Sequence, residues 1–225
     1  MNKALTIAID GPVGSGKGTL SVALSKKLGI LYLYTGGMYR ALTLACIRKG
    51  VNLSDEDAVF EVLTTCNLHL KVSSGDTVIY LGEEDVTDEI IRPEISNKTP
   101  IIAAHPRVRE EMVRRQKEIV EGHDAIIEGR DIATVVAPNA EVKIFLTASL
   151  EARSFRRFEQ FKERGIQKTY EEVLSDTSER DSLDENRVAS PLEKHKGTIE
   201  VDTTADRVEQ TVAKVMEILK ERQFI

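Results

Sequence analysis

The sequence predicts an α/β protein built on a parallel sheet, and two observations carry this prediction. Short apolar runs alternate along the chain with segments of helical spacing, which is typical of strands buried on both faces. The first apolar run leads into a glycine-rich turn and then a helical segment, the local order of strand–turn–helix units in open α/β sheets. With 225 residues, the chain has the length of one domain with insertions.

Five apolar runs predict the strands of this sheet. They are Leu5–Asp10, Ile30–Tyr34, Ala125–Glu128, Val142–Thr147 and Thr198–Val201. Helices are expected to begin near Gly16, Gly36, Pro106, Leu150 and Asp206. The last of these helices has one apolar face with charged residues elsewhere, so we expect it to pack on the sheet and close the fold.

Two segments depart from this alternation. From about Leu68 to Ile95, apolar and polar residues alternate around the turn Ser73–Asp76, which predicts a small antiparallel insertion. The residues alone leave open whether this insertion is a decorative hairpin or part of a site. Near Gly165–Thr169 the helical pattern breaks in a polar segment, which is either a mobile lid or an ordinary solvated loop.

Composition excludes several classes of protein. The formal net charge of −6 argues against a general binder of nucleic acid or membrane surfaces. Cys46 and Cys66 offer neither metal-ligand spacing nor a disulfide framework, which fits a reducing compartment. No signal segment and no apolar run of about 18 residues is evident. We therefore expect a soluble cytoplasmic protein.

The turn after the first strand reads Gly11-Pro12-Val13-Gly14-Ser15-Gly16-Lys17-Gly18-Thr19, and we call it the phosphate loop. Its glycines let backbone N–H groups converge on phosphate oxygens at a helix N-terminus. Lys17 adds a positive charge and Thr19 a hydroxyl for Mg²⁺. A glycine-rich turn that binds nothing is the alternative, but strand, spacing and Lys17 all weigh against it. Gly18 between Lys17 and Thr19 resembles the variant found in nucleoside-monophosphate kinases.

The chain offers no evident general base. Its histidines, His69, His105, His123 and His195, are scattered, and no Ser/His/Asp or Cys/His constellation is suggested. Phosphoryl transfer to an acceptor that is itself a phosphate fits this composition. Such a phosphate has a second pKa near ~6, so it is already a nucleophile at pH 7. Catalysis then depends on positioning, charge neutralisation and exclusion of water.

Arginines occur where such a site would need them, because a guanidinium holds phosphate oxygens bidentately. Arg130-Asp131 is the strongest candidate, since it follows the third strand at the sheet edge where ligands gather. The other candidates are Arg40, Arg107, Arg109, Arg153, Arg156, Arg157, Arg180 and Arg187. Taken singly, each is also consistent with a solvated or ion-paired surface residue.

From Leu5 to the C-terminal helix, the chain resembles the bacterial cytidylate kinases. The resemblance rests on Ile9–Thr19, Gly36–Arg40, Ile102–Arg109, Glu128–Asp131, Val142–Leu146 and Glu179–Arg187. The phosphate loop alone indicates a broad superfamily. Its combination with Ala-Ala-x-Pro-x-Val-Arg and Gly-Arg-Asp is far more specific.

The resemblance implies a three-layer P-loop kinase fold with a five-stranded parallel sheet, forming a single kinase domain over residues 1–225. Residues 36–120 would form the nucleoside-monophosphate-binding region, including the β insertion at about 68–95. Residues from about 155 to 172 would form a mobile lid. The implied reaction is in-line phosphorylation of CMP and dCMP by ATP with Mg²⁺, carried out by a monomer.

The resemblance also implies the roles of site residues. Gly11, Pro12, Val13, Gly14, Ser15, Gly16, Lys17, Gly18 and Thr19 would hold the ATP phosphates, with Thr19 directed to Mg²⁺ directly or through water. Arg40, Arg130 and Arg187 would bind the acceptor phosphate, and Arg180 with Asp184 the sugar hydroxyls. Arg153 and Arg157 would neutralise charge on the transferred group. Lys17, Arg130, Arg157 and Arg187 would be the catalytic residues.

Arg109 and Asp131 would read the cytosine edge, and the chemistry of the base agrees. Cytosine presents an exocyclic amine beside a ring nitrogen acceptor, so a carboxylate and a guanidinium complement it. Uracil presents a carbonyl there and would leave Asp131 facing an acceptor. An unpaired buried group of this kind costs about 1–3 kcal/mol.

Two residues depart from the family pattern. Thr35 stands where the family usually has serine, and its hydroxyl is expected to keep the contact with the substrate. Pro100 falls where the family commonly has a serine near the sugar, and proline offers neither hydroxyl nor N–H. Discrimination between ribose and deoxyribose is therefore open, with Thr99 or Ser96 as possible substitutes.

Two alternatives remain to be compared with this hypothesis. One keeps the reaction but changes the acceptor to UMP, AMP or another small phosphate or hydroxyl compound. The other is a GTPase switch, which needs Asp-x-x-Gly and Asn-Lys-x-Asp motifs. No aspartate has glycine three residues later, and Asn97–Pro100 lacks the final aspartate, so the sequence weighs against a switch.

Overall fold

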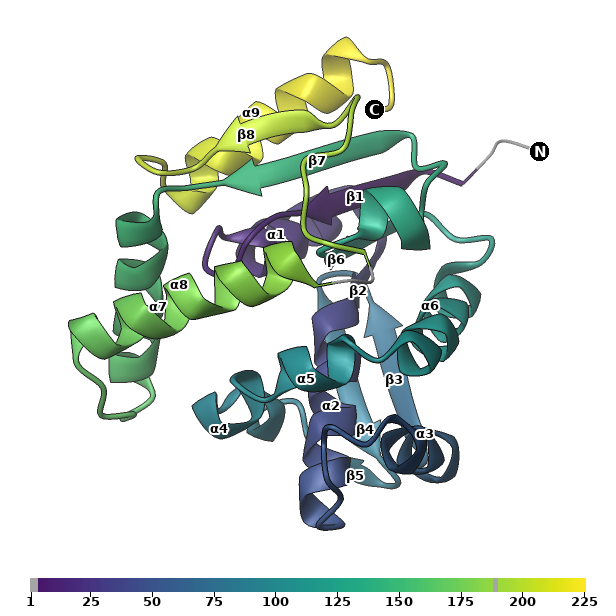
Figure 1. The fold of residues 1–225 in the computed structure, drawn as a ribbon. Coiled ribbons are helices and arrows are strands. Elements are labelled where there is room, and N and C mark those ends of the chain that lie inside the picture. Colours follow the sequence, from purple (N-terminus) through teal and green to yellow (C-terminus); the bar gives the residue numbers. More distant parts are fainter. Residues whose placement is uncertain (1–3, 188–189) are drawn as a thin grey trace.

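The computed structural model describes residues 4–187 and 190–225. Its centre is a parallel sheet with the strand order β2-β6-β1-β7-β8 (Figure 1). These strands span β2 Leu31–Tyr34, β6 Ala125–Gly129, β1 Thr6–Asp10, β7 Val142–Thr147 and β8 Ile199–Asp202. Every strand begins and ends within one residue of the range that its apolar run predicts, so the five-stranded parallel sheet is confirmed.

Helices cover both faces of the sheet, which gives the predicted three layers. On β1, Ile7 and Ile9 share a core with α1 (Lys17–Leu28) and α9 (Val208–Glu221). The intervening Ala8 belongs to a second core with α6 (Pro106–Val120) and the π-helical turn η2 (Ile132–Val136). This alternation follows from the period of two along a strand, which sends successive side chains to opposite faces.

The chain between β2 and β6 forms a second region with its own apolar core, below the sheet in Figure 1. Its elements are α2 Thr35–Arg48, α3 Glu56–Thr65, β3 Leu68–Ser73, β4 Asp76–Leu81, β5 Glu84–Asp85, the 3₁₀ turn η1 Glu89–Ile91, α4 Pro93–Ser96 and α5 Thr99–Ala103, followed by α6. Strands β3, β4 and β5 form an antiparallel sheet, as predicted. Pairing ends at Asp85, however, and the rest of the predicted 68–95 segment is mostly helical in η1 and α4.

The antiparallel insertion is tied to the parallel sheet at its turn. The backbone N–H of Gly75 donates to Ser25 Oγ at 2.7 Å, and the Ser74 hydroxyl donates to the Ser25 carbonyl at 2.9 Å. The hydroxyl of Thr77 donates to the carbonyl of Tyr32 in β2. These contacts attach the insertion to the end of α1 and to β2, so it is a packed part of the fold.

Helices α7 (Leu150–Glu163) and α8 (Tyr170–Asn186) form a hairpin that projects from the sheet (Figure 1). The polar break near Gly165–Thr169 is the turn of this hairpin, and Thr169 begins α8 through a capping box with Glu172. The predicted lid covers this turn and the helix ends beside it; its mobility stays a prediction. Within the described ranges, no helix is long and apolar enough to cross a bilayer.

Candidate active site

The phosphate loop connects β1 to α1, and its shape depends on glycine at position 11. Gly11 has φ +149°, and a Cβ there would lie 2.2 Å from the carbonyl oxygen of Leu146 in β7. Gly16, with φ +91°, is the last residue of the loop before α1 begins at Lys17, so the loop continues into the first turn of that helix. The loop therefore bends around the N-terminus of a twelve-residue helix, whose unpaired N–H groups favour an anion.

Lys17 is buried under this loop. Its Nζ donates to the carbonyl oxygens of Gly11 and Pro12, both at 2.7 Å. Burial lowers the pKa of Lys17 well below its usual range and the charge of Arg130 adds to that shift, while the carboxylate of Glu128 opposes it. The structure thus places the Lys17 amine at the loop, and the exposed Thr19 lies two residues further along the same helix.

A cavity of about 930 Å³ opens in front of the phosphate loop. The loop from Val13 to Thr19 forms one wall, and Arg40, Arg130 and Arg157 come to it from three other elements. Burial lowers the pKa of Arg157 to about 10, helped by the nearby charge of Arg40. The mutual repulsion of these cations, which raises their energy in an empty site, is relieved by a polyanion. This cavity is therefore suited to phosphate groups.

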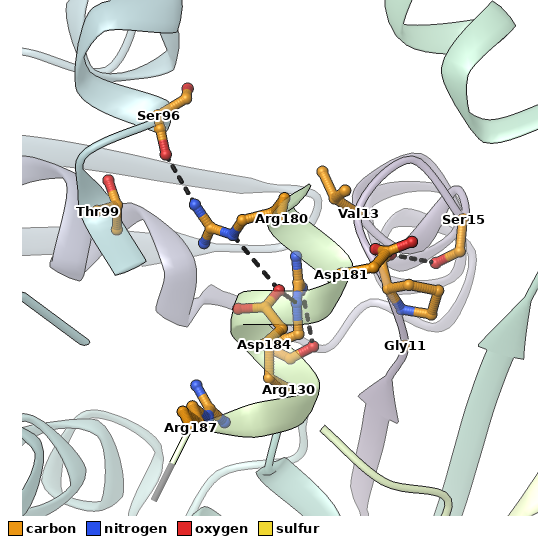
Figure 2. Close-up of polar contacts among 12 residues, drawn as sticks. Gly11, Val13, Ser15, Ser96, Thr99, Arg130, Arg180, Asp181, Asp184 and Arg187 are labelled. Atoms are coloured by element: carbon orange, nitrogen blue, oxygen red, sulfur yellow. Dashed lines mark hydrogen bonds and ion pairs between the residues drawn. The ribbon is translucent and has the colours of Figure 1, made fainter. Parts of the chain in front are cut away.

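A second group of charges lies beside this cavity, centred on Asp184 of α8 (Figure 2). Arg130 donates through Nε to Asp184 Oδ2 at 2.7 Å, and Arg180 approaches the same oxygen at 3.4 Å. Burial opposes ionisation of Asp184, but Arg130 and Arg180 hold its pKa at about 2. Arg180 also donates to the Ser96 carbonyl at 2.7 Å, and Arg40 to the Ser96 hydroxyl. Ser96 thereby joins α8 to the second region of the fold.

Arg109 and Asp131 form a buried ion pair next to this group. Their side chains are only 6% and 10% exposed, and Arg187 Nη2 lies 3.7 Å from the other oxygen of Asp131. Arg109 comes from α6 and Asp131 from the end of β6, so the pair exists only because α6 packs across the sheet. A carboxylate and a guanidinium side by side can bind one edge of a nucleobase.

The predicted site residues therefore occupy one region of the fold, in two groups. The cavity is lined by residues 13–19, Arg40, Arg130 and Arg157. Beside it, and paired with protein groups, lie Thr35, Arg109, Asp131, Arg180, Asp184 and Arg187. The Thr35 hydroxyl donates to the Glu128 carbonyl at 2.6 Å, at the end of β6.

Two predicted contributions have other placements. Arg153 donates to the carbonyls of Val13 and Ala148, and it is not among the described residues that line the cavity. The hydroxyl of Thr99 donates to the Ile95 carbonyl at 2.8 Å, and Thr99 is buried. Arg153 is thus occupied by protein groups, and Thr99 is directed into the packing of α4 and α5.

Glu128 is a site residue to which the sequence analysis assigned no role. Its side chain lines the cavity, and its Oε2 has no hydrogen-bond partner among the described residues. Burial raises the pKa of Glu128, while the charges of Lys17 and Arg130 oppose that rise. The signal was its place at a strand end, directly before Gly129-Arg130. Such a carboxylate, lining the same cavity as Thr19, has the chemistry that Mg²⁺ prefers.

Asp10 is a second residue whose role was missed. Its two carboxylate oxygens accept the backbone N–H groups of Ile132 and Ala133, both at 2.8 Å. These are the first N–H groups of η2, so Asp10 holds the turn that follows Asp131. An acidic residue at the end of β1, just before Gly11, is the sequence feature that could have indicated this.

The Asp184→Asn variant is expected to lose less stability than the wild type as the pH falls below about 4. The pKa of Asp184 is about 2 in the fold against an ordinary 3.8, so its ionisation stabilises the fold above pH 4 and ceases to do so towards pH 2. This contribution is about 2 kcal/mol. Urea unfolding between pH 2 and 6 measures it. A free-energy difference between wild type and variant that stays constant over this range would contradict the prediction.

Comparisons with known proteins identify the family. The family model described as cytidylate kinase matches residues 7–221. The cytidylate kinase of Caldanaerobacter subterraneus subsp. tengcongensis is 44% identical over 220 residues, covering 98% of this chain and 96% of that protein. Those of Geobacillus kaustophilus and Bacillus subtilis are 42% and 40% identical, each over 222 residues and covering 99% of both chains. A crystal structure of an uncharacterised protein from Eubacterium ventriosum, 12% identical, superposes with a TM-score of 0.53 over 97% of this chain and 99% of its own, which supports the fold alone.

The family model matches most of the chain, and relatives that are 40–44% identical cover nearly its whole length. The chain therefore belongs to the cytidylate kinase family.

Proposed function

We propose that this nucleoside-monophosphate kinase transfers the γ-phosphoryl group of ATP directly and in line to the phosphate of CMP or dCMP. One observation carries the proposal: a single cavity joins the phosphate loop with Lys17 to Arg40, Arg130 and Arg157. Two phosphate-bearing ligands brought together there would have their repulsion offset by these four cations. Transfer between them needs no general base, because the acceptor phosphate is already ionised at pH 7.

On the donor side, the phosphate loop would cradle the β- and γ-phosphates and Lys17 would exchange its carbonyl partners for phosphate oxygens. Thr19 and the unpartnered oxygen of Glu128 would hold Mg²⁺ together with those phosphates. No group of three His, Cys, Asp or Glu that could bind a metal occurs among the described residues, which fits a cation held largely by its substrate. Bound there, Mg²⁺ would neutralise charge on the transferred group.

On the acceptor side, Arg40 and Arg130 would bind the CMP phosphate, with Arg187 approaching from the segment after α8. Arg109 and Asp131 would read the cytosine edge. Because this pair is buried, the base would reach it only when the side chains or helices that cover the pair move aside. Arg157 on α7 would close over the transferring group and help to exclude water.

An assay of one acceptor panel with ATP tests the proposal. CMP and dCMP are expected to give the highest kcat/KM, and UMP, AMP and GMP values at least about tenfold lower. A higher kcat/KM for any other acceptor would assign the site to that nucleotide. Hydrolysis of ATP or GTP without transfer to any acceptor would overturn the proposal altogether.

Pro100 bears on the sugar that the site accepts. It is the second residue of α5, after Thr99, whose hydroxyl is occupied, and it follows Ser96 of α4, whose hydroxyl accepts from Arg40. The wild type is therefore expected to use CMP and dCMP with kcat/KM values within about threefold. Pro100→Ser is expected to raise the preference for CMP over dCMP by about five- to tenfold, the effect of one added hydrogen bond to the 2′-hydroxyl. Steady-state kinetics with both acceptors checks this, and a ratio unchanged by the substitution would contradict it.

A further inference from the structure

We propose that Arg153 is a positioning residue, which together with Asp181 fixes α8 against the phosphate loop. The proposal rests on the proposed function, in which the phosphate loop binds ATP and α8 carries residues that bind CMP. It gives Arg153 a role different from the phosphate contact that the sequence resemblance implies.

The guanidinium of Arg153 is surrounded by protein acceptors. Its Nε donates to the Ala148 carbonyl at 2.9 Å, its Nη1 to the Val13 carbonyl at 3.1 Å, and its Nη2 lies 2.6 Å from Asp181 Oδ2. The side chains of Arg153 and Asp181 are 8% and 14% exposed. All three nitrogens of the guanidinium are therefore engaged within the protein.

The contact with the phosphate loop is direct. Besides the bond to Val13, a Cβ on Gly14 would lie 2.8 Å from the carbonyl oxygen of Arg153. The loop and the first turns of α7 are thus packed backbone against backbone. A displacement of Arg153 would therefore shift Val13 and Gly14, which line the cavity.

The contact with α8 places Arg153 close to the acceptor groups. Arg180, Asp181 and Asp184 lie along the same helix, on the side that faces the site (Figure 2). Arg180 donates to Ser96, and Asp184 accepts from Arg130. The Arg153–Asp181 pair is the link between these residues and the loop, so it sets their distance from the donor phosphates.

The neighbouring arginine of the same helix shows the contrast. Arg157, one turn further along α7, lines the cavity and lies over the ring of Phe161, 5.1 Å from its centroid. A cation free to meet phosphate is already supplied by Arg157. Arg153, one turn earlier on α7, is instead paired with Asp181, and a buried charge of this kind is costly without its partner.

Double-mutant analysis with Arg153→Met, Asp181→Asn and the double variant tests the proposal. Calorimetry gives the Kd of CMP without ATP, and kinetics gives kcat and the KM of ATP. Each single variant is expected to weaken CMP binding by roughly tenfold, because displaced contact groups lose their geometry. The double variant should bind CMP no less tightly than the single variant with the larger loss of affinity, since the two substitutions remove the same interaction. Lys162→Met, an exposed cation on α7, is the matched control and should leave CMP binding unchanged.

Three outcomes would overturn the proposal. One is a Kd of CMP unchanged in Arg153→Met while kcat falls and Asp181→Asn has no effect, the pattern of a phosphate contact. A second is full additivity of the two substitutions. A role limited to stability would lower the unfolding temperature of the variants without changing the CMP affinity of the folded protein, and would also overturn it.

Amide hydrogen exchange supplies a readout that does not depend on CMP. Both single variants are expected to raise exchange in residues 170–187 and in the phosphate loop together, and exchange unchanged in either segment would contradict the positioning role. A wild type that does not bind CMP would defeat the proposed function. The exchange result would still decide whether Arg153 and Asp181 hold α8 to the loop.

Discussion

Lys17→Met is expected to lower kcat by about 10²–10³-fold or more while the protein stays folded. Lys17 is the cation nearest the loop backbone, and in a buried site one preorganised charge on the transferred group has an effect of this size. Methionine fills a similar volume but cannot donate, so the Gly11 carbonyl loses its partner, while the Pro12 carbonyl keeps its bond from the Ser15 hydroxyl. The KM of ATP should rise as well, because the loop is held less firmly.

Kinetics with saturating CMP, together with circular dichroism and thermal unfolding, measures both parts of this expectation. Lys27→Met is the matched control, because it makes the same change on the exposed part of α1, away from the loop. A Lys17→Met enzyme that keeps more than about a tenth of the wild-type kcat would remove Lys17 from the catalytic role.

Asp131→Asn is expected to lower the preference for CMP over UMP by about 10- to 100-fold. The carboxylate accepts the exocyclic amine of cytosine in the proposed complex. The amide of asparagine can instead donate to the carbonyl that uracil presents at that position. Part of the loss of kcat/KM with CMP will come from Arg109, which is buried and would lose its ion-pair partner.

The ratio of kcat/KM for CMP to that for UMP separates these two effects, because the loss of the ion pair weakens both acceptors alike. Asp124→Asn is a suitable control, since Asp124 directly precedes β6, at the end of that strand opposite to Asp131, and its carboxylate accepts the backbone N–H of Leu5. An unchanged ratio in Asp131→Asn would exclude Asp131 from base reading.

The relation between donor and acceptor groups depends on short connections between loops and helices. Asp10 joins the end of β1 to the turn after Asp131, and the Arg153–Asp181 pair joins the phosphate loop to α8. Asp10 directly precedes Gly11, and Arg153 donates to the carbonyl of Val13 in the phosphate loop. The residues proposed to bind donor and acceptor are therefore connected by direct hydrogen bonds and ion pairs, which suits a reaction that depends on positioning.

Sequence patterns predicted the parallel sheet because its strands are buried on both faces and hence read as apolar runs. They missed α8 for the opposite physical reason. The residues that α8 turns inward include Thr177, Arg180 and Asp184, so its buried face is polar and shows no apolar period. The face whose polarity prevented a prediction of this helix from apolar periodicity is the face that carries Arg180 and Asp184 of the candidate site.

The local sequence by itself determined the phosphate loop, since glycine spacing and Lys17 act within nine consecutive residues. It also determined that Arg130 and Asp131 lie at the carboxyl edge of the parallel sheet, since strand polarity fixes where a strand ends. Which arginine meets which carboxylate was decided only by tertiary structure. Arg153 and Arg157 differ by one helical turn in the sequence, yet one is paired with Asp181 and the other lines the cavity. Burial and pairing depend on residues far apart in the chain, and only the packed fold brings those residues together.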